Sequence, residues 1–385
     1  GTPGTVALLA RVFQEHGKLT WPELFAPAVR LAQQGFIVGP RLAKMLASER
    51  GQRLRTYAAA RDYFFPGGKP LQSGTRKTNP QFAETLIAIA ERGPRAFYSG
   101  AIAEDIVAAV RNAPGNPGRL SLADLASYDI VRRDPVCHGY RSYRICGMGP
   151  PSSGGLTVGL TLGMLTAFDL HSMGPDDPQS WHLLAEASKL AFADRNQYMA
   201  DGDFVPVPEA GLLHRDYIAK RATLIRRETS ILAPVVHGLP PGTATPKRAP
   251  DNQKGRPGTS HISIVDGSGN AVSMTTTIEG AFGSQLMVRG FLLNNELTDF
   301  SFLPNKDGQP VANRAAPRKR PRSSMAPTIV FNADNSLRLV VGAPGGSRII
   351  GYVAKTLVAV LDWGLDIQAA IDLGHVVNRN GATDF

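Results

Sequence analysis

Apolar residues recur at helical spacing through the N-terminal part of the chain. The pattern predicts amphipathic helices over Trp21–Gln34, Pro80–Arg92 and 180–198. A further helix is expected to begin after Ser121, whose hydroxyl can cap it. The weakly charged stretch 152–168 is short for a membrane span and is interrupted by Gly and Thr, so we interpret it as a core helix. No membrane-spanning segment is expected.

Two short strands are predicted within 131–148, and the chain's two cysteines, Cys137 and Cys146, flank their probable turn. A cross-strand disulfide is one interpretation. A chain this long does not need a single disulfide bond for its stability, so we expect free, buried thiols instead.

A stretch rich in Pro, Gly, Lys and Arg, 234–258, separates the helical part from a β-rich part and indicates a linker or a mobile tail. Beyond it, alternating residues in 261–265, a five-residue loop with Asp-Gly and Ser-Gly, and β-prone residues predict a hairpin. If the register is symmetric about that loop, Thr259 lies opposite Thr277 with Cβ atoms about 5 Å apart. The two hydroxyls are then expected to meet.

A second hairpin is predicted from 328–331 and 337–341. Its second strand runs into Gly345 and Gly346, and helical spacing then begins, with Ser347 as the expected cap. Unpaired backbone N–H groups at a helix N-terminus, with glycines that permit close approach, can form an oxyanion or phosphate site. An ordinary strand-to-helix turn is the alternative.

Composition is that of a globular protein. The chain has 385 residues, of which 43% are hydrophobic and 19% charged, and its 40 Gly and 29 Pro indicate many tight turns. This length predicts two lobes or one large unit with a sizeable core. The chain begins with Gly1 and shows no leader pattern, so any leader is expected to lie outside it.

The formal net charge is +10, and a basic run supplies part of it: Arg314, Arg318, Lys319, Arg320 and Arg322. Nucleic-acid binding, a solvated loop, and a cationic rim that draws anionic substrates to a pocket are three interpretations. No aromatic platform or recognition motif accompanies the run, so no nucleic-acid partner is expected.

Metal and dinucleotide sites are not expected. The sequence contains no Cys-x-x-Cys, His-Glu-x-x-His, EF-hand, Gly-x-Gly-x-x-Gly or Gly-x-Ser-x-Gly motif. His182 and His261 are interpreted as structural residues, and no cofactor is predicted.

Thr259 is the candidate nucleophile. A threonine hydroxyl needs a base, and a new N-terminal amine, with a reference pKa of about 7.7–8.0, would provide one in the same residue. Before cleavage the hydroxyl could attack the Gly258 carbonyl in an N-to-O acyl shift, and glycine there permits the contorted backbone. Hydrolysis of the ester would free the amine.

Several long motifs in this order resemble the γ-glutamyltranspeptidase family. They cover essentially the whole chain: GTPGTV at 1–6, PSSGG at 151–155, the stretch from AEA at 185 to ADR at 193–195, TSHIS at 259–263, LLNNELTDFS at 292–301, RPRSSMAPT at 320–328 and PGGS at 344–347.

The resemblance implies an N-terminal-nucleophile hydrolase of α+β class: a four-layer αββα sandwich with two stacked, mainly antiparallel sheets between helical layers. Cleavage between Gly258 and Thr259 would give a large subunit, 1–258, and a small one, 259–385, which stay together as one intertwined domain. The chain stops at Phe385, short of the family's usual end, so a terminal strand and helix are expected to be missing. The resemblance favours a periplasmic or secreted location over a cytoplasmic one.

The resemblance also assigns roles by position. Thr259 resembles the nucleophile and Thr277 the threonine that positions it, while Gly345 and Gly346 resemble the oxyanion hole. The donor's α-ammonium and α-carboxylate are expected to be bound by two pairs of residues, respectively Glu296 with Asp299 and Ser323 with Ser324.

Glu279 departs from the family, which usually carries Asn at this position near the substrate carboxylate. The family's carboxylate-binding arginine lies before the segment at which this chain begins. The length of 301–322 neither predicts nor excludes a loop that covers the pocket.

These residues favour an autoprocessing hydrolase and transferase of γ-glutamyl amides such as glutathione, which passes a γ-glutamyl ester on Thr259 to water or to an amino acid or peptide acceptor. One alternative is a same-fold acylase of glutaryl or other side-chain amides, which Glu279 favours. Another is a non-catalytic basic binding protein that works through 314–322.

Overall fold

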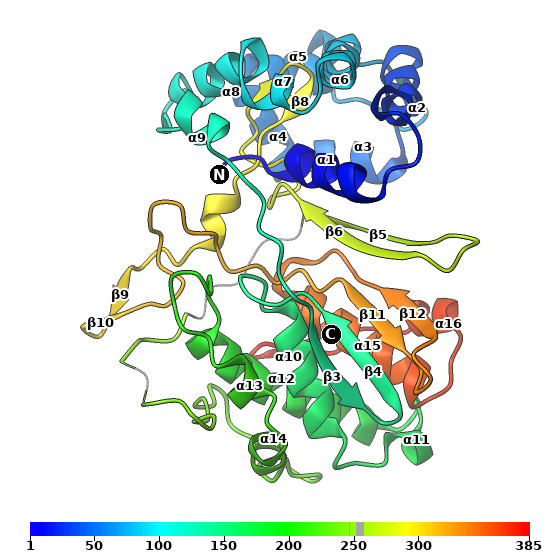
Figure 1. Cartoon of the computed structure of the whole chain (residues 1–385), viewed down its shortest axis with the longest axis vertical. Helices are drawn as coiled ribbons and strands as arrows, with labels where there is room; N and C mark the ends of the chain where they lie inside the picture. Colours follow the sequence, from blue (N-terminus) through cyan, green and yellow to red (C-terminus); the bar gives the residue numbers. More distant parts are fainter. Residues whose placement is uncertain (246, 252–257) are drawn as a thin grey trace. The chain divides into compact units, whose positions relative to one another are not determined.

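Two compact units make up the chain, and each joins segments that are distant in the sequence. The computed structural model describes residues 1–245, 247–251 and 258–385 (Figure 1). The first unit combines 1–132 with 280–296, and the second combines 133–279 with 297–385. Each unit therefore contains residues from both sides of the Gly258–Thr259 bond.

The first unit is mainly helical. The predicted helices α2 (Trp21–Gln34) and α6 (Pro80–Arg92) are confirmed, and they pack against each other, with the Trp21 indole donating to the Ile89 carbonyl at 3.0 Å. Ser121 caps the next predicted helix by accepting from the Asp124 N–H at 3.2 Å. The remaining elements are α1 Thr5–His16, α3 Pro40–Ala47, α4 Glu49–Gln52, α5 Ala58–Phe64, α7 Arg95–Tyr98, α8 Ala101–Arg111, α9 Leu122–Ala126, β1 Phe36–Ile37, β2 Arg76–Lys77, β7 Met287–Val288 and β8 Phe291–Leu292.

A four-stranded antiparallel sheet forms the centre of the second unit. Its order is β12 (Leu337–Val341), β11 (Thr328–Phe331), β4 (Tyr143–Gly147), β3 (Val136–Tyr140). Both predicted strand pairs are confirmed. The join between them, β4 with β11, brings residues near 146 beside residues near 329, which local pattern alone does not predict.

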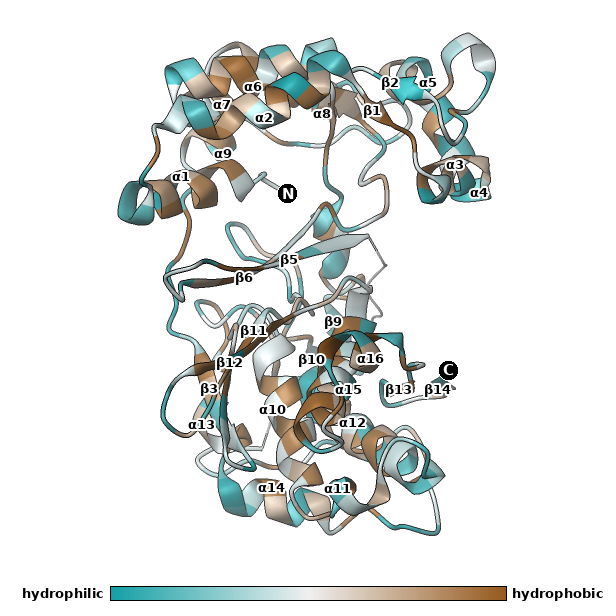
Figure 2. Ribbon diagram, turned by 90° about the vertical axis from the view of Figure 1, so that its right-hand side faces the viewer, coloured by the Kyte–Doolittle hydropathy of each residue, from teal (hydrophilic) through white to brown (hydrophobic). Residues whose placement is uncertain are grey.

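Three helices build the core of this unit. α10 (Gly154–Leu165) packs on β3 and β4 and contacts both α12 (Pro178–Tyr198) and α15 (Ile349–Leu361). Figure 2 shows much of the hydrophobic ribbon of this unit in α10 and α15. Other elements are α11 Leu170–Met173, α13 Glu209–Leu212, α14 Arg215–Ala222, α16 Ile367–Asp372, β9 Asn305–Lys306, β10 Gln309–Pro310, β13 Val377–Asn378 and β14 Thr383–Asp384.

The core helix predicted over 152–168 is confirmed as α10. The helix α12 differs from its amphipathic prediction, because it is buried on every face from Leu183 to Tyr198. Its charged residues are buried with partners: Lys189 lies 2.6 Å from Glu186, and Asp194 lies 3.2 Å from Arg221. Buried charges persist when they are paired in this way.

The β5–β6 hairpin has the predicted register. β5 (Thr259–Val265) pairs with β6 (Ala271–Thr277), and Thr259 lies directly opposite Thr277. Asp266 shapes the loop by accepting from the backbone N–H groups of Ser268 and Asn270, both at 2.9 Å. The Ser273 hydroxyl ties the hairpin to the larger sheet by donating to the Val341 carbonyl at 3.1 Å.

Cys137 and Cys146 form a disulfide, so the expectation of free thiols was wrong. The two residues are directly opposed in the β3–β4 ladder, with Cα atoms 4.1 Å apart. Directly opposed residues point to the same face of a sheet, which brings the two sulfurs together. The bridge follows from hairpin register and not from a shortage of hydrophobic core.

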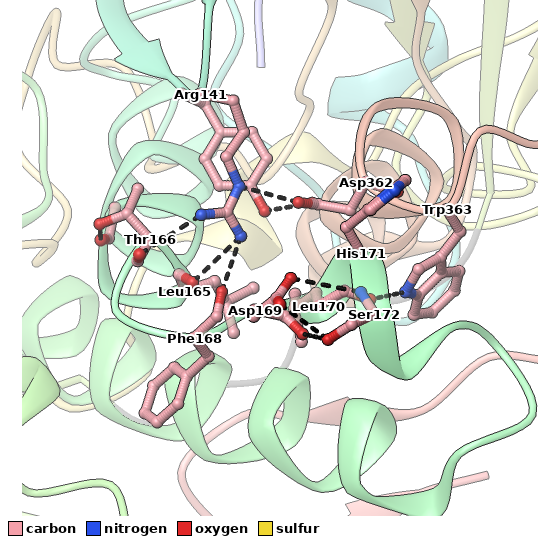
Figure 3. A network of polar contacts seen from close by, with 12 residues as sticks. Arg141, Leu165, Thr166, Phe168, Asp169, Leu170, His171, Ser172, Asp362 and Trp363 are labelled. Atoms are coloured by element: carbon pink, nitrogen blue, oxygen red, sulfur yellow. Dashed lines mark hydrogen bonds and ion pairs between the residues drawn. The ribbon is translucent and has the colours of Figure 1, made fainter.

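The C-terminal ends of α10 and α15 are joined by a polar network around Asp362 (Figure 3). Asp362 accepts from the Tyr140 hydroxyl and, at 2.8 Å, from Arg141 Nε. The same guanidinium donates to the Phe168 carbonyl at 2.9 Å, just beyond α10. A cation at a helix C-terminus satisfies orphan carbonyls and opposes the helix dipole.

The described part of 234–258, predicted as a linker or a mobile tail, makes hydrogen bonds to residues of α12. The Gly238 N–H donates to Asp194, the Arg248 carbonyl accepts from Gln197, and the Asp251 N–H donates to the Asn196 carbonyl, each at 2.8 Å. This segment therefore lies along α12. Residues 246 and 252–257 of the predicted linker lie outside the described residues.

Candidate active site

A pocket in the second unit brings together most of the residues that the sequence singled out. Five separate segments converge on it: the end of α12, the paired ends of β5 and β6, the residue Asp299, the segment before β11, and the turn before α15. Its lining consists of Arg195, Thr259, Thr277, Glu279, Asp299, Arg322, Ser323, Ser324, Met325, Gly346, Ser347 and Ile349.

The hydroxyl oxygens of Thr259 and Thr277 lie 3.5 Å apart, at the long limit of a hydrogen bond. The Thr277 oxygen also accepts from the Glu279 backbone N–H at 2.8 Å. A hydroxyl carries one donor and two acceptor positions. The Glu279 N–H occupies one acceptor position of the Thr277 oxygen, and the Thr259 hydroxyl donates to the other.

Gly345 and Gly346 form the turn that precedes α15. Both have positive φ, 149° and 60°, a region in which residues with a Cβ are rare, and Gly346 lines the pocket. Ser347 does not cap the helix as predicted, because a short 3-10 turn intervenes and Arg348 occupies the N-cap position. The Ser347 hydroxyl instead accepts from the Arg379 guanidinium at 2.7 Å.

Ser323 and Ser324 are both held in place by the protein. The Ser323 hydroxyl oxygen accepts from the Met325 N–H at 3.1 Å, and the Ser324 hydroxyl oxygen accepts from Arg195 at 2.5 Å. Both side chains line the pocket. Hydrogen bonds therefore restrain both hydroxyl oxygens within the pocket wall.

Two buried arginines lie in the pocket wall; sequence reasoning gave Arg195 no site role and gave Arg322 one only as part of a possible cationic rim. Arg195 is 2% exposed and Arg322 is 4% exposed. Burial, together with the nearby Arg322, lowers the pKa of Arg195 well below its ordinary value. Arg322 forms an ion pair of 3.2 Å with Asp251. The ADR motif that carries Arg195 was the available signal.

The acidic candidates divide between the two units. Asp299 and Glu279 line the pocket of the second unit, and Glu279 is 4% exposed with a positive φ of 70°. A non-glycine residue in this region costs about 1–3 kcal/mol, and such residues cluster at functional sites. Glu296 ends the segment 280–296 of the first unit, so its part in donor binding stays a prediction.

The basic run is not one solvated loop. Arg322 is buried in the pocket, and Lys319 is 9% exposed, with its ammonium donating to the carbonyls of Ala312 and Arg314. Arg314 and Arg318 remain exposed. Two of the five cations are thus parts of the interior, and the run does not form a continuous basic surface.

His261 is a structural residue, as predicted. Its ring nitrogens contact the hydroxyls of Thr275 and Ser263 at 2.8 and 3.0 Å. Burial lowers the pKa of His261, which favours the neutral ring. His182 contacts the Arg226 carbonyl at 2.8 Å. Within the described ranges, no helix is both long and apolar enough to cross a bilayer.

Comparison with known proteins gives consistent matches. The γ-glutamyltranspeptidase family model matches residues 1–384. The chain is 37% identical over 380 residues to the glutathione hydrolase proenzyme of Escherichia coli (strain K12), which covers 96% of this chain and 63% of that protein. It is 34% identical over 388 residues to the acylase ACY 1 proenzyme of Pseudomonas sp. (strain SE83), covering 100% of this chain and 65% of that protein.

Solved structures agree with these relatives. Cephalosporin acylase from Bacillus halodurans superposes with a TM-score of 0.81 and 27% identity, over 96% of this chain and 64% of that one. The likeness confirms the α+β fold predicted from the sequence. The chain spans slightly less than two thirds of the length of these relatives.

Proposed function

The chain belongs to the γ-glutamyltranspeptidase family, as its motifs predicted, and from this premise we propose that it is an autoprocessing hydrolase and transferase of γ-glutamyl amides. The donor is a γ-glutamyl compound such as glutathione, and the acceptor is water, an amino acid or a peptide. The reaction needs neither a metal nor a cofactor. Its nucleophile is Thr259.

One observation carries the proposal: the Thr259 hydroxyl lies 3.5 Å from that of Thr277 in a pocket that also contains Gly346 and Ser324. A nucleophile, a hydroxyl that positions it, a turn with unpaired N–H groups and donors for an anion are the parts that acyl transfer requires. All lie within the second unit.

Maturation begins with attack of the Thr259 hydroxyl oxygen on the Gly258 carbonyl carbon. The Gly258–Thr259 C–N bond breaks, the nitrogen takes the hydroxyl proton, and an ester joins Gly258 to the Thr259 side chain. The α-amine of Thr259 is free from this point, and water then hydrolyses the ester, which leaves a Gly258 carboxylate and frees the Thr259 hydroxyl. The products are a large subunit that ends at Gly258 and a small subunit that begins at Thr259, which remain associated.

In turnover the free α-amine of Thr259 takes the hydroxyl proton as the oxygen attacks the donor's γ-carbonyl. The N–H groups of Gly345 and Gly346 stabilise the oxyanion that forms. The proton passes to the leaving amine, which departs and leaves a γ-glutamyl ester on Thr259. Water or an acceptor amine attacks this ester and regenerates the hydroxyl.

Donor recognition is assigned to charged and hydroxyl groups. Asp299 and Glu296 bind the α-ammonium, and Ser323 and Ser324 donate to the α-carboxylate. Glu279 adds a further acid to the pocket wall, close to the space that the carboxylate would occupy. The negative charge of Glu279 therefore bears on which donor the pocket accepts.

A second candidate is an acylase that removes glutaryl or related side chains through the same ester chemistry. Two observations favour it: Glu279 where the family usually has Asn, and the similarity to the acylase ACY 1 proenzyme and to cephalosporin acylase. The two candidates share Thr259 and differ only in the donor.

Two measurements test the proposal. Gel electrophoresis of purified protein should show two chains, with Thr259 as the first residue of the smaller, and Thr259→Ala should show one chain and no activity. A γ-glutamyl anilide, a glutaryl anilide and a dipeptide acceptor then identify donor and acceptor. Cleavage of the glutaryl compound alone would establish the acylase, and an uncleaved, inactive wild type would contradict both candidates.

A further inference from the structure

Arg195 is a buried cation whose described partners are all neutral. Its guanidinium donates to the hydroxyls of Ser153 at 2.8 Å and Ser324 at 2.5 Å, and to the Asn196 side-chain oxygen at 3.3 Å. Asp251 and Asp299 act on it at longer range. A buried charge without a close counterion is costly, so an anion in the adjoining pocket would stabilise it.

Arg322 provides the contrast within the same pocket. It is buried to the same degree, but its guanidinium lies 3.2 Å from the Asp251 carboxylate. Its charge is therefore already balanced by the protein. The described hydrogen bonds of Arg195 go only to neutral groups, so a negatively charged ligand could balance its charge.

Hydrogen bonds also restrict where the hydroxyl hydrogens of Ser323 and Ser324 can point. Ser324 accepts from Arg195, and Ser323 accepts from the Met325 N–H, so neither hydroxyl can direct its hydrogen back along those bonds. Both side chains line the pocket. Their hydrogens are thus available to one anion, and a carboxylate has two oxygens to receive them.

The turn before α10 supports this arrangement from behind. Ser153 donates to the Ser323 carbonyl with its N–H at 2.8 Å and with its hydroxyl at 2.7 Å, while its hydroxyl oxygen accepts from Arg195. A Cβ at Gly154 would collide with the Met325 carbonyl. Ser153, Gly154 and Arg195 therefore hold the 323–325 segment at a fixed distance, which gives a structural role to the PSSGG and ADR motifs.

We propose that Arg195 is the positioning residue of a carboxylate subsite, fixing the Ser324 oxygen so that the Ser323 and Ser324 hydrogens meet one carboxylate of the donor. The inference rests on the proposed function and applies to donors with a free carboxylate at the end remote from the scissile amide. Both γ-glutamyl and glutaryl donors satisfy this condition. A donor without that carboxylate gains nothing from Arg195.

Three anilides separate the contributions of the donor's charges. The γ-glutamyl compound carries an ammonium and a carboxylate, the glutaryl compound only the carboxylate, and the 4-aminobutyryl compound only the ammonium. Arg195→Met should lower kcat/KM about 10- to 100-fold for whichever carboxylate donors the wild type uses, through KM more than kcat, and leave the 4-aminobutyryl value unchanged. Arg195→Lys keeps the positive charge but loses the planar guanidinium with its several donors. Its kcat/KM for the carboxylate donors should lie between those of the wild type and Arg195→Met.

Controls keep folding apart from recognition. Self-cleavage into two chains and an unchanged circular dichroism spectrum indicate that a variant is folded. Ser153→Ala should lower kcat/KM for the same carboxylate donors, but by less than Arg195→Met does. Equal losses for all three donors, or no loss in Arg195→Met, would overturn the inference. If the wild type cleaves no anilide, the proposed function fails separately, and calorimetric titration with glutarate decides: weaker binding by Arg195→Lys supports the subsite, and unchanged binding overturns it.

Discussion

The Glu279 backbone N–H donates a 2.8 Å hydrogen bond to the Thr277 hydroxyl, the group that lies opposite Thr259. A main-chain donor cannot rotate away, so it fixes the oxygen that positions the candidate nucleophile. The positive φ of Glu279 is part of the backbone path that aims this N–H.

Thr277→Val should slow precursor cleavage by roughly 10- to 100-fold, because it removes the hydroxyl and leaves the Glu279 N–H without its acceptor. Thr277→Ser keeps the hydroxyl and should cleave at nearly the wild-type rate. The rate is read from the conversion of precursor to two chains on gels. Equal rates for the Val and Ser variants would show that the hydroxyl does not act.

Glu279→Asn should raise kcat/KM for carboxylate-bearing anilides about 10-fold relative to the 4-aminobutyryl anilide, since it removes a negative charge from the pocket. Asparagine tolerates positive φ, so the backbone should be retained. Steady-state kinetics with the three anilides provide the measurement. Selective loss of the γ-glutamyl compound, with the glutaryl compound unaffected, would instead identify Glu279 as a ligand of the donor's ammonium.

Asp362→Asn should lower the free energy of unfolding by roughly 2–3 kcal/mol. The substitution weakens a buried carboxylate that receives both Tyr140 and Arg141, and the partial exposure of Arg141 keeps the loss below that of a fully buried pair. Denaturant titration measures it. Asp169→Asn, at an exposed carboxylate in the same region, is the matched control and should cost much less (Figure 3).

Acid should destabilise the second unit through His138. Burial lowers the pKa of His138 to about 4, so the unfolded chain binds the proton more strongly, and the stabilisation is complete above pH 6.5 and lost as the pH falls toward 4. The expected loss between pH 7 and pH 5 is about 1–2 kcal/mol. Denaturant titrations should show this slope in the wild type and a shallower one in His138→Phe; identical slopes would contradict the assignment.

Local pattern predicted elements of both units, including the hairpin that carries Thr259 and Thr277. The apolar spacing of α2 and α6, the loop residues of the β5–β6 hairpin and its symmetric register were all readable from neighbouring residues, and the register placed Thr259 opposite Thr277. Long-range pairing was not readable. The β4–β11 ladder depends on strands that are far apart in the sequence, and periodicity carries no information about which strands become neighbours.

Buried polar residues account for most of the differences. The solvated-loop interpretation of the basic run is wrong for Arg322 and Lys319, because sequence gives no sign of their acceptors, which are the Asp251 carboxylate for Arg322 and backbone carbonyls for Lys319. The polar face of α12 was misread for the same reason. Cys137 and Cys146 were judged by chain length, whereas their opposed register decided the outcome.

Ser153 already donates to the Ser323 carbonyl while Gly258 and Thr259 are still joined in one chain. The Ser323 side of the pocket is therefore held in place in the uncleaved chain, and the proposed cut converts the Thr259 nitrogen from amide to amine and the Gly258 carbonyl to a carboxylate. A small carboxylate that fills the pocket should then occupy precursor and mature protein alike. A binding assay with such a carboxylate on the Thr259→Ala precursor would measure this occupancy before any cut.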